Sequence, residues 1–512
     1  MANDTALEQY TGDTRFFGHP RGLSTLFFTE MWERFSFYGL RPLLVLFMSA
    51  ALSAGGFGFV RTQASAIVGI YAAGVYLFSL PGGWIADRWL GLRRAVFCGA
   101  VLIALGHMCI GFASFAHARV PFFLGLILIV LGTGLLKPNI SATVGELYTD
   151  KGARRDAGFS IFYMGINSGA FIGQLVTGTL GEKIGWHWGF GAAGVGMLIG
   201  LAVFYFRSPG TLGPIGMSPT RDPDPARQAS QERSVKSAIS VFTAVLVAMI
   251  VLAATGVVTL DPVSIGQKMT VVLVGVGVAY FAYIFIAGGL TGDEMKRMGV
   301  IIVLFVFSAI FWGAFEQAPT SLNLFANDFT DRKLGSFEMP AIWFQSINSL
   351  FIIILAPLFA VLWVWLAKKG WDFSSPAKFA IGLALAAVGF LLMIRAANAV
   401  VASGGTLKVS PWWLVGSYFF QSVGELCISP VGLSSMTKLA PRKFVGQMMG
   451  VWFLATSVGN LVAGLVGGHV DPSKLEQTPL VFSGTTIALV AAAAICALLV
   501  IPTRKMMGEA KH

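Results

Sequence analysis

Residues 29–41 read TEMWERFSFYGLR, and they place charges inside a segment that is otherwise apolar enough to cross a membrane. On an α-helix, Glu30, Glu33 and Arg34 share one face because they are spaced i, i+3 and i+4. Each charge at bilayer depth costs about 2.5–3.5 kcal/mol. A helix that carries several of them normally faces an aqueous cavity, so this stretch predicts a membrane protein with a transport site.

The polar face of this helix continues past its first charges. Tyr38 lies one turn beyond Arg34, and Arg41 lies two turns beyond it on nearly the same line. One alternative is a helix start at the membrane surface, with long side chains that extend to water. Lys137 lies in another apolar segment and also needs a partner, which favours a shared cavity over that alternative.

The composition predicts an all-α membrane protein. The chain has 512 residues, of which 55% are hydrophobic and 12% charged, and its mean hydropathy is +0.73. Soluble domains usually carry about 25% charged residues. Residues 1–22 are polar and lack the apolar core of a cleavable signal peptide. The four cysteines form no CxxC pair, so we expect small core residues, with no disulfide framework and no metal site.

Fourteen apolar segments are long enough to span a bilayer as helices. They cover residues 23–53, 61–88, 94–117, 120–148, 157–185, 188–207, 235–259, 267–290, 297–328, 339–368, 376–400, 411–439, 443–470 and 479–503. A long polar connection rich in Pro, Gly, Ser and Arg follows the sixth segment. The seventh and eighth lack a charge, Pro or Asn in their interiors, which is typical of lipid-facing accessory helices. Removing these two leaves an arrangement of six plus six.

The expected organisation follows from this count. We predict an N-terminal cytoplasmic segment 1–22, a six-helix bundle 23–207, a cytoplasmic linker 208–234, two accessory transmembrane helices 235–290, a second six-helix bundle 291–503 and a cytoplasmic tail 504–512. Most of the 36 Lys and Arg residues fall on the side of the membrane that holds the N-terminus. The positive-inside rule then places both termini in the cytoplasm of a multi-pass inner-membrane protein. This distribution explains the net charge of +11 without a nucleic-acid partner.

Residues 83–94, at the end of the second segment, read GWIADRWLGLRR. This stretch resembles a loop of the major facilitator superfamily, whose pattern is Gly-x-x-x-Asp-Arg-x-x-Gly-x-Arg-Arg. Gly83 is small enough for close helix packing, and Asp87 is placed to bond across the bundle at the helix end. The resemblance implies a fold of two six-helix bundles and a role for Asp87 in gating, without naming a substrate.

Three further stretches narrow the resemblance. They are residues 30–38 (EMWERFSFY), 132–141 (GTGLLKPNIS) and 162–169 (FYMGINSG). Together they resemble the signatures of the proton-dependent oligopeptide transporter family, and the likeness extends over about residues 23–503. The first signature of that family ends in two tyrosines. Phe37 occupies the first of these positions here, so a ligand hydrogen bond from that hydroxyl is not available.

Polar residues of the first bundle take their expected roles from this resemblance. Lys137 lies too deep in its segment to extend to the surface, and a lysine neutralised in a dry core is the alternative. The resemblance places it beside the charges of the first helix and near the peptide. It also implies peptide contacts for Asn167 and Tyr76, for which helix packing is the alternative.

The second bundle supplies acidic, amide and aromatic side chains. Glu316 lies in the middle of one segment, and Glu425 lies in another, where Pro430 interrupts the helix and frees carbonyl groups. The resemblance implies that peptides contact Trp312, Asn348, Glu425, Ser429, Trp452 and Phe453. The two tryptophans are expected to form side-chain pockets, with simple packing as the alternative.

The charges inside the segments comprise four acids and three bases, so one carboxylate is a natural proton site. We assign proton coupling to Glu30, Glu33, Arg34, Lys137 and Glu316. We assign peptide binding in the first bundle to Arg34, Tyr38, Arg41, Tyr76, Lys137 and Asn167. The resemblance pairs Arg41 with Glu316, and Lys137 with Glu425, as a gate on the extracellular side. His107 stands alone in an apolar run and is expected to be a packing residue.

These features predict a proton-coupled symporter that imports di- and tripeptides by alternating access. Its expected partners are small peptides, protons and membrane lipid; we expect a monomer and no cofactor, with protons as the coupling ion. A nitrate or other small organic-anion carrier of the same superfamily is the alternative, and Glu425, an acidic partner for an amine, argues against it. No nucleophile or metal motif supports an enzyme, and the six-plus-six pattern argues against a channel or receptor.

Overall fold

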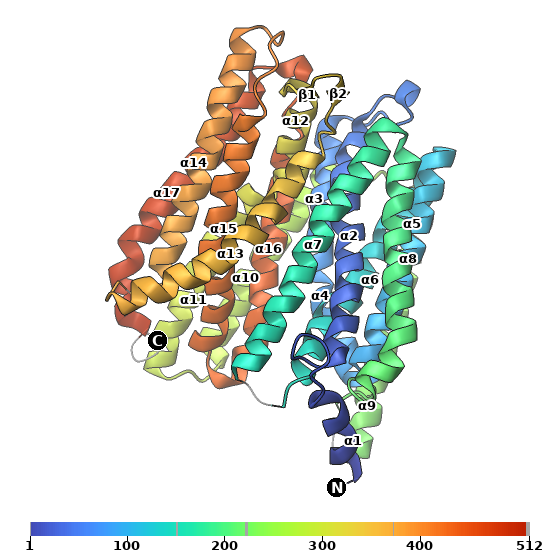
Figure 1. Ribbon diagram of the computed structural model, residues 1–512, viewed down its shortest axis with the longest axis vertical. Helices are drawn as coiled ribbons and strands as arrows, with labels where there is room; N and C mark the ends of the chain where they lie inside the picture. Colours follow the sequence, from blue (N-terminus) through green and yellow to red (C-terminus); the bar gives the residue numbers. More distant parts are fainter. Residues whose placement is uncertain (1, 150–151, 221–223, 372, 508–512) are drawn as a thin grey trace. The chain divides into compact units, whose positions relative to one another are not determined.

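The computed structural model describes residues 2–149, 152–220, 224–371 and 373–507, and this part of the chain is nearly all helical (Figure 1). One short hairpin pairs β1 (Lys333–Leu334) with β2 (Phe337–Glu338). The chain forms two compact units, each defined by the contacts among its own residues. Unit 1 comprises Met1–Leu43 with Gly74–Asp261, and unit 2 comprises Leu44–Ala73 with Pro262–His512.

Unit 1 contains most of the helices of the first half of the chain. They are α1 (Ala2–Thr11), α2 (Arg21–Ser49) as far as Leu43, the end of α3 (Arg61–Leu77), α4 (Ser79–Ile85), η2 (Ala86–Leu90), α5 (Leu92–Ala116), α6 (Arg119–Glu146), α7 (Ala153–Lys183), α8 (Trp186–Leu212) and α9 (Pro225–Ala254). Helices α5 and α6 approach closely because glycines face each other. A Cβ added at Gly106 would lie 2.6 Å from the carbonyl oxygen of Gly125.

Unit 2 contains the remaining elements. They are the end of α2, η1 (Leu52–Ala54), the first turns of α3, α10 (Pro262–Ala287), α11 (Gly292–Phe315), η3 (Ala318–Leu322), α12 (Asn323–Phe329), the β1–β2 hairpin, α13 (Trp343–Lys368), α14 (Ser375–Ala402), α15 (Trp412–Leu439), η4 (Arg442–Phe444), α16 (Val445–Gly467), η5 (Pro472–Lys474) and α17 (Gln477–Met507). Helix α11 begins with a capping box, because Thr291 accepts from the Glu294 amide and the Glu294 side chain accepts from the Thr291 amide.

Twelve helical stretches of the described chain are long and apolar enough to cross a bilayer. The expectation of a multi-pass all-α membrane protein is thereby confirmed, whereas the count of fourteen is not. The predicted segments 23–53 and 411–439 correspond to α2 and α15, which are helices of 29 and 28 residues but are not among the twelve. These two helices carry several of the predicted site charges, which lower their hydropathy.

The polar connection between α8 and α9 is shorter than the predicted 208–234. Helix α8 continues through Pro209 to Leu212, and α9 begins at Pro225. The Asp224 side chain accepts from the Ala226 amide and caps α9, with Pro at the first helical position. Residues 221–223 of this connection and 508–512 of the predicted tail lie outside the described residues.

The close approach of α4 to α6 is made by Gly82 and not by Gly83. A Cβ on Gly82 would lie 2.0 Å from the carbonyl oxygen of Gly134, whereas a Cβ on Gly83 would meet no atom within 4 Å. The prediction that Gly83 permits close helix packing is therefore wrong. Successive residues of an α-helix point about 100° apart, so the motif places the neighbouring glycine at the contact.

We expect Gly82→Ala to destabilise unit 1, because the added methyl group forces α4 away from the α6 backbone. Overpacking of this kind typically costs about 1–3 kcal/mol. Gly83→Ala is the matched control and should change stability little, since its methyl group enters open space. Thermal unfolding of the two purified variants in the same detergent measures the difference. Equal midpoints for both variants would contradict the assignment of the contact to Gly82.

The segment between α1 and α2 folds back onto the ends of α6 and α7. His19 Nδ1 lies 2.9 Å from Tyr148 Oη, and both side chains are buried. The Arg154 guanidinium donates to the carbonyl oxygen of Asp13 at 2.8 Å. Burial, and then the charge of Arg154, lower the pKa of His19, while burial raises the pKa of Tyr148 to about 12. A neutral imidazole and a protonated phenol therefore hold this segment in place at neutral pH.

The docking of this segment should weaken as the pH falls. Because the docked state lowers the pKa of His19, its stabilisation is present above the ordinary His pKa of about 6.5 and is lost as the pH falls below that value. We expect amide exchange of residues 13–19, corrected for its intrinsic pH dependence, to accelerate in that acidic range. His19→Gln should remove this acceleration. An unchanged pH dependence in the variant would show that another group controls docking.

Candidate functional site

Helix α2 brings two carboxylates and one guanidinium together in the interior of unit 1. Arg34 Nε lies 3.1 Å from Glu30 Oε1 and also forms an ion pair with Glu33 Oε2. Arg34 is 2% exposed and Glu33 is 0% exposed, so water does not screen these charges. The second oxygen of each carboxylate, Glu30 Oε2 and Glu33 Oε1, is buried without a hydrogen-bond partner among the described residues. A buried oxygen of this kind is a favourable place for a proton.

Lys137 of α6 joins this cluster from a second helix. Its Nζ lies 3.9 Å from the centroid of the Tyr76 ring. The charge of Lys137 also acts on Glu30, and the Tyr38 and Tyr76 hydroxyls lie near enough to act on Arg34. Three helices therefore bring the predicted proton-coupling residues of unit 1 together with two predicted peptide contacts.

The Phe37 ring contacts the guanidinium groups of Arg34 and Arg41, although Phe37 lacks the hydroxyl group that the resemblance would place at this position. Its ring lies 5.0 Å from the guanidinium carbon of Arg34 and 5.8 Å from that of Arg41. The ring is 1% exposed, so these cation–π contacts are shielded from water. Tyr38, which is half-buried, is the neighbouring residue that retains a hydroxyl.

Asn167 of α7 is buried and uses one of its amide hydrogens within its own helix. Its Nδ2 donates to the Tyr163 carbonyl oxygen at 3.0 Å. Its expected contact with a peptide stays a prediction.

Asp87 lies in the π-helical turn η2 and is exposed to solvent. The backbone carbonyl oxygen of Asp87 accepts from the Thr220 amide at 3.0 Å, but its side chain forms no hydrogen bond or ion pair with the described residues. The motif is anchored instead by Gly91, at φ +78°, and by Arg93, which donates to the Gly213 carbonyl oxygen at 2.8 Å. The gating role of Asp87 stays a prediction.

A second polar cluster joins α13 to α15 in unit 2. Asn348 Nδ2 donates to Ser422 Oγ at 2.8 Å and to Glu425 Oε2 at 3.5 Å. Glu316, 7% exposed at the end of α11, lies near enough for its charge to act on Glu425. Unit 2 thus brings together the predicted residues Glu316, Asn348 and Glu425. Ser422 was not predicted, although its i, i+3 spacing to Glu425 places both on one face of α15.

Comparison with known proteins decides the class of this chain, since residues 93–481 match the POT family. The chain belongs to the POT family. It is 49% identical over 498 residues to the peptide transporter YePEPT of Yersinia enterocolitica, with 97% of each chain covered. It is 35% identical to a di-/tripeptide transporter of Lactococcus lactis subsp. cremoris, covering 97% of this chain and 98% of that one.

A solved structure agrees with this assignment. The crystal structure of a peptide transporter POT in complex with sulfate superimposes with a TM-score of 0.87 at 40% identity, covering 98% of this chain and 99% of that chain. The family predicted from the three signature stretches, and its major facilitator fold, are confirmed. The expected class, a transporter rather than an enzyme, is confirmed as well.

The aromatic residues predicted for the side-chain pockets of this POT-family chain are tightly packed. Trp312 is 9% exposed and Trp452 is 6% exposed. A Cβ on Gly432 would lie 2.2 Å from the Trp452 ring, and one on Gly459 would lie 2.5 Å from Trp312 Cβ. Both tryptophans therefore pack against helix backbone.

Two more of the predicted contacts lie in the same unit. Phe453 is half-buried next to Trp452. Ser429 Oγ is buried without a hydrogen-bond partner among the described residues. Trp312 Nε1 is likewise buried without such a partner, and the peptide contacts of both residues stay predictions.

Sequence reasoning missed one ion pair of this POT-family chain. Arg61 Nη1 pairs with Asp328 Oδ2 and also donates to the Val470 carbonyl oxygen at 3.1 Å. Their side chains are 21% and 11% exposed, so the pair is largely withdrawn from solvent. It joins the start of α3 to the end of α12 within unit 2. Each residue lies at a segment end, where a charge is expected anyway, so the sequence alone did not distinguish this pair.

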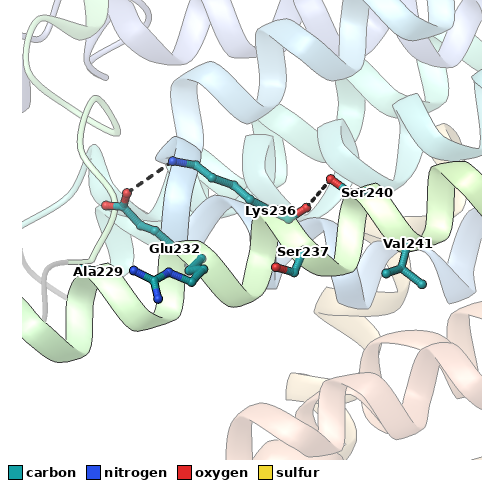
Figure 2. A pocket seen from close by; sticks show the side chains of 7 residues that line it. Ala229, Glu232, Lys236, Ser237, Ser240 and Val241 are labelled. Atoms are coloured by element: carbon teal, nitrogen blue, oxygen red, sulfur yellow. Dashed lines mark hydrogen bonds and ion pairs between the residues drawn. The ribbon is translucent and has the colours of Figure 1, made fainter.

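Two cavities within the units lie away from these clusters. One of about 530 Å³ lies along α9 (Figure 2), and one of about 410 Å³ lies among α11, α16 and α17. None of the predicted site residues lines either cavity. The polar clusters around Arg34 and Asn348, rather than these cavities, are the candidate site.

Proposed function

We propose that this POT-family protein carries di- and tripeptides across the membrane together with protons, by alternating access. The observation that carries the proposal is the pair of buried ion pairs that Glu30 and Glu33 both form with Arg34 Nε. Relatives named as peptide and di-/tripeptide transporters support the same activity. Protons are the coupling ion, and no cofactor takes part.

The charges of the two units suit the two ends of a free peptide. Arg34, Arg41 and Lys137 of unit 1 are guanidinium and ammonium groups, which match the two oxygens of a peptide carboxylate. Glu425 and the amide of Asn348 in unit 2 suit a peptide amino group. The apolar slots would accept many side chains because aromatic walls are non-directional.

Proton coupling would use the competition between two carboxylates for one guanidinium. When one carboxylate takes a proton, Arg34 is engaged by the other alone, so the strength of its interactions with a peptide changes. Glu316 and Lys137 complete the set proposed for this path. The cycle would take place in a monomer with fourteen spans, lying in the inner membrane with both termini in the cytoplasm.

A labelled-dialanine uptake assay in proteoliposomes tests this substrate class. Unlabelled dialanine should compete with the label, whereas nitrate at the same concentration should not. An acidic Glu425 held by Asn348 provides a site for an amine and none for a small anion. Competition by nitrate with none by dialanine would instead support an anion carrier.

We further propose that Arg41 with Glu316, and Lys137 with Glu425, close the extracellular side during the cycle. Each of Arg41→Glu and Glu316→Arg should lower uptake at least about tenfold, because each places like charges together. The double swap should recover part of that loss. Spin-label distances on the extracellular loops should shift toward outward opening in the singles. A swap that recovers nothing, with unchanged distances, would refute this pairing.

A further inference from the structure

The first half of helix α9 is attached to unit 1. Val235 is the only buried residue among those described in this helix. The Lys236 ammonium lies 5.6 Å from the centroid of the Trp89 ring, and Gln228 Nε2 donates to the Arg88 carbonyl oxygen at 3.4 Å. These contacts fix the polar half of α9 beside the end of η2.

The second half of α9 is apolar and exposed. No charged residue follows Lys236 within the helix, and the large apolar side chains exposed beyond it are Val241, Phe242, Val245, Val247, Met249, Val251 and Leu252. A helix of 30 residues is about 45 Å long, whereas the hydrocarbon core is about 30 Å thick. The charged first turns therefore extend into the headgroup region when the apolar half lies in lipid.

A pocket lies at this boundary between the polar and apolar halves. It has a volume of about 530 Å³ and is lined by Ala229, Glu232, Arg233, Lys236, Ser237, Ser240 and Val241. Figure 2 shows the Lys236 side chain extending back along α9 toward Glu232, with which it forms a 3.8 Å ion pair. The Ser240 hydroxyl donates to the Lys236 carbonyl oxygen at 2.9 Å. Arg233 forms no ion pair with a described residue, so the pocket carries a net positive charge.

We propose that this pocket binds the headgroup of an anionic phospholipid. The phosphate would lie at Arg233 and Lys236, whose donors match phosphate oxygens, and the Ser237 hydroxyl would add a further donor. The acyl chains would follow the exposed apolar half of α9 from Val241 onward, in continuity with the lipid-facing surface. Glu232 already forms an ion pair with Lys236, so little negative charge remains to attract the amine of a zwitterionic headgroup.

Photochemical labelling in vesicles tests this site directly. The full-length protein is reconstituted in phosphatidylethanolamine with phosphatidylglycerol, and a trace of phosphatidylglycerol carries a photoreactive group near its headgroup. We expect adducts to concentrate on residues 229–241. A phosphatidylcholine probe of the same design should label this stretch several-fold less. Equal labelling by the two probes, or displacement of the lipid by millimolar inorganic phosphate, would overturn the proposal.

Matched variants separate this pocket from a general effect of charge. Arg233→Gln with Lys236→Gln should reduce labelling of residues 229–241 about fivefold or more, since each basic residue near an anionic surface strengthens binding roughly fivefold and one of the two is offset by Glu232. The control is Lys369→Gln, because Lys369 lies 5.1 Å from the Trp365 ring in a similar cation–aromatic contact. It should leave that labelling unchanged. Equal losses of labelling in the double variant and in the Lys369→Gln control would refute a specific site. The comparison of the two lipid probes uses the unmutated protein, so it tests the proposal even if a variant fails to fold.

Discussion

Glu30→Gln and Glu33→Gln should each abolish proton-driven accumulation of a dipeptide while leaving peptide exchange measurable. Both side chains form ion pairs with Arg34 in the interior of unit 1, and each retains one buried oxygen without a partner among the described residues. An amide keeps the size of the carboxylate and part of its hydrogen bonding, but it cannot take up and release a proton. Accumulation against a gradient should fall at least about tenfold, because the protonation step is removed while binding is kept.

Counterflow and gradient-driven uptake separate these two activities in the same proteoliposomes. Glu8→Gln is the control, since Glu8 is exposed in the same unit and forms no ion pair with a described residue. It should accumulate peptide as the unmutated protein does. Unmutated levels of accumulation in both Glu30 and Glu33 variants would remove this pair from the proton path.

Blocking either end of a dipeptide should weaken its competition with labelled substrate by several-fold or more. A C-terminal amide removes the charge expected at Arg34, Arg41 and Lys137, and an N-acetyl group removes the charge expected at Glu425. The guanidinium and ammonium groups then lose their charge-assisted hydrogen bonds to the peptide carboxylate, which weakens binding. Exchange of one neutral side chain for another should matter less, because the contacts expected for side chains are apolar and non-directional.

The variant Glu425→Gln tests which unit binds the amino end of the peptide and which binds the carboxyl end. In Glu425→Gln, the penalty for N-acetylation should shrink while the penalty for C-amidation remains, because only the partner of the amine has changed. The substituted amide keeps a side-chain oxygen that can accept from Asn348, so the polar cluster of unit 2 should be retained. The ratio of the two penalties is therefore the quantity to measure. Equal competition by both blocked peptides and the free dipeptide would refute recognition of the substrate by its terminal charges.

The core of the site on α2 was predictable from residue spacing. The i, i+3, i+4 pattern places Glu30, Glu33 and Arg34 on one face whatever the rest of the fold, and the ion pairs confirm that arrangement. The contact of Lys137 with Tyr76 depends on how α3 and α6 pack, so the resemblance named both residues but did not predict that they touch.

Contacts between distant segments account for most of what sequence reasoning missed. Arg61 and Asp328 are separated by 267 positions, and neither is unusual at a segment end. Gly82 was overlooked in favour of Gly83, because helix phase relative to a neighbour is a property of packing and not of the motif. The role of Phe37 between two guanidiniums likewise required the positions of both side chains.

Uptake of labelled dialanine into liposomes with an imposed pH gradient tests proton-coupled peptide transport most directly. We predict accumulation above the external concentration when the outside is acidic, and loss of that accumulation when a protonophore collapses the gradient. Uptake that reaches the same level with and without the gradient would contradict proton coupling, and no uptake of dialanine under either condition would contradict peptide transport.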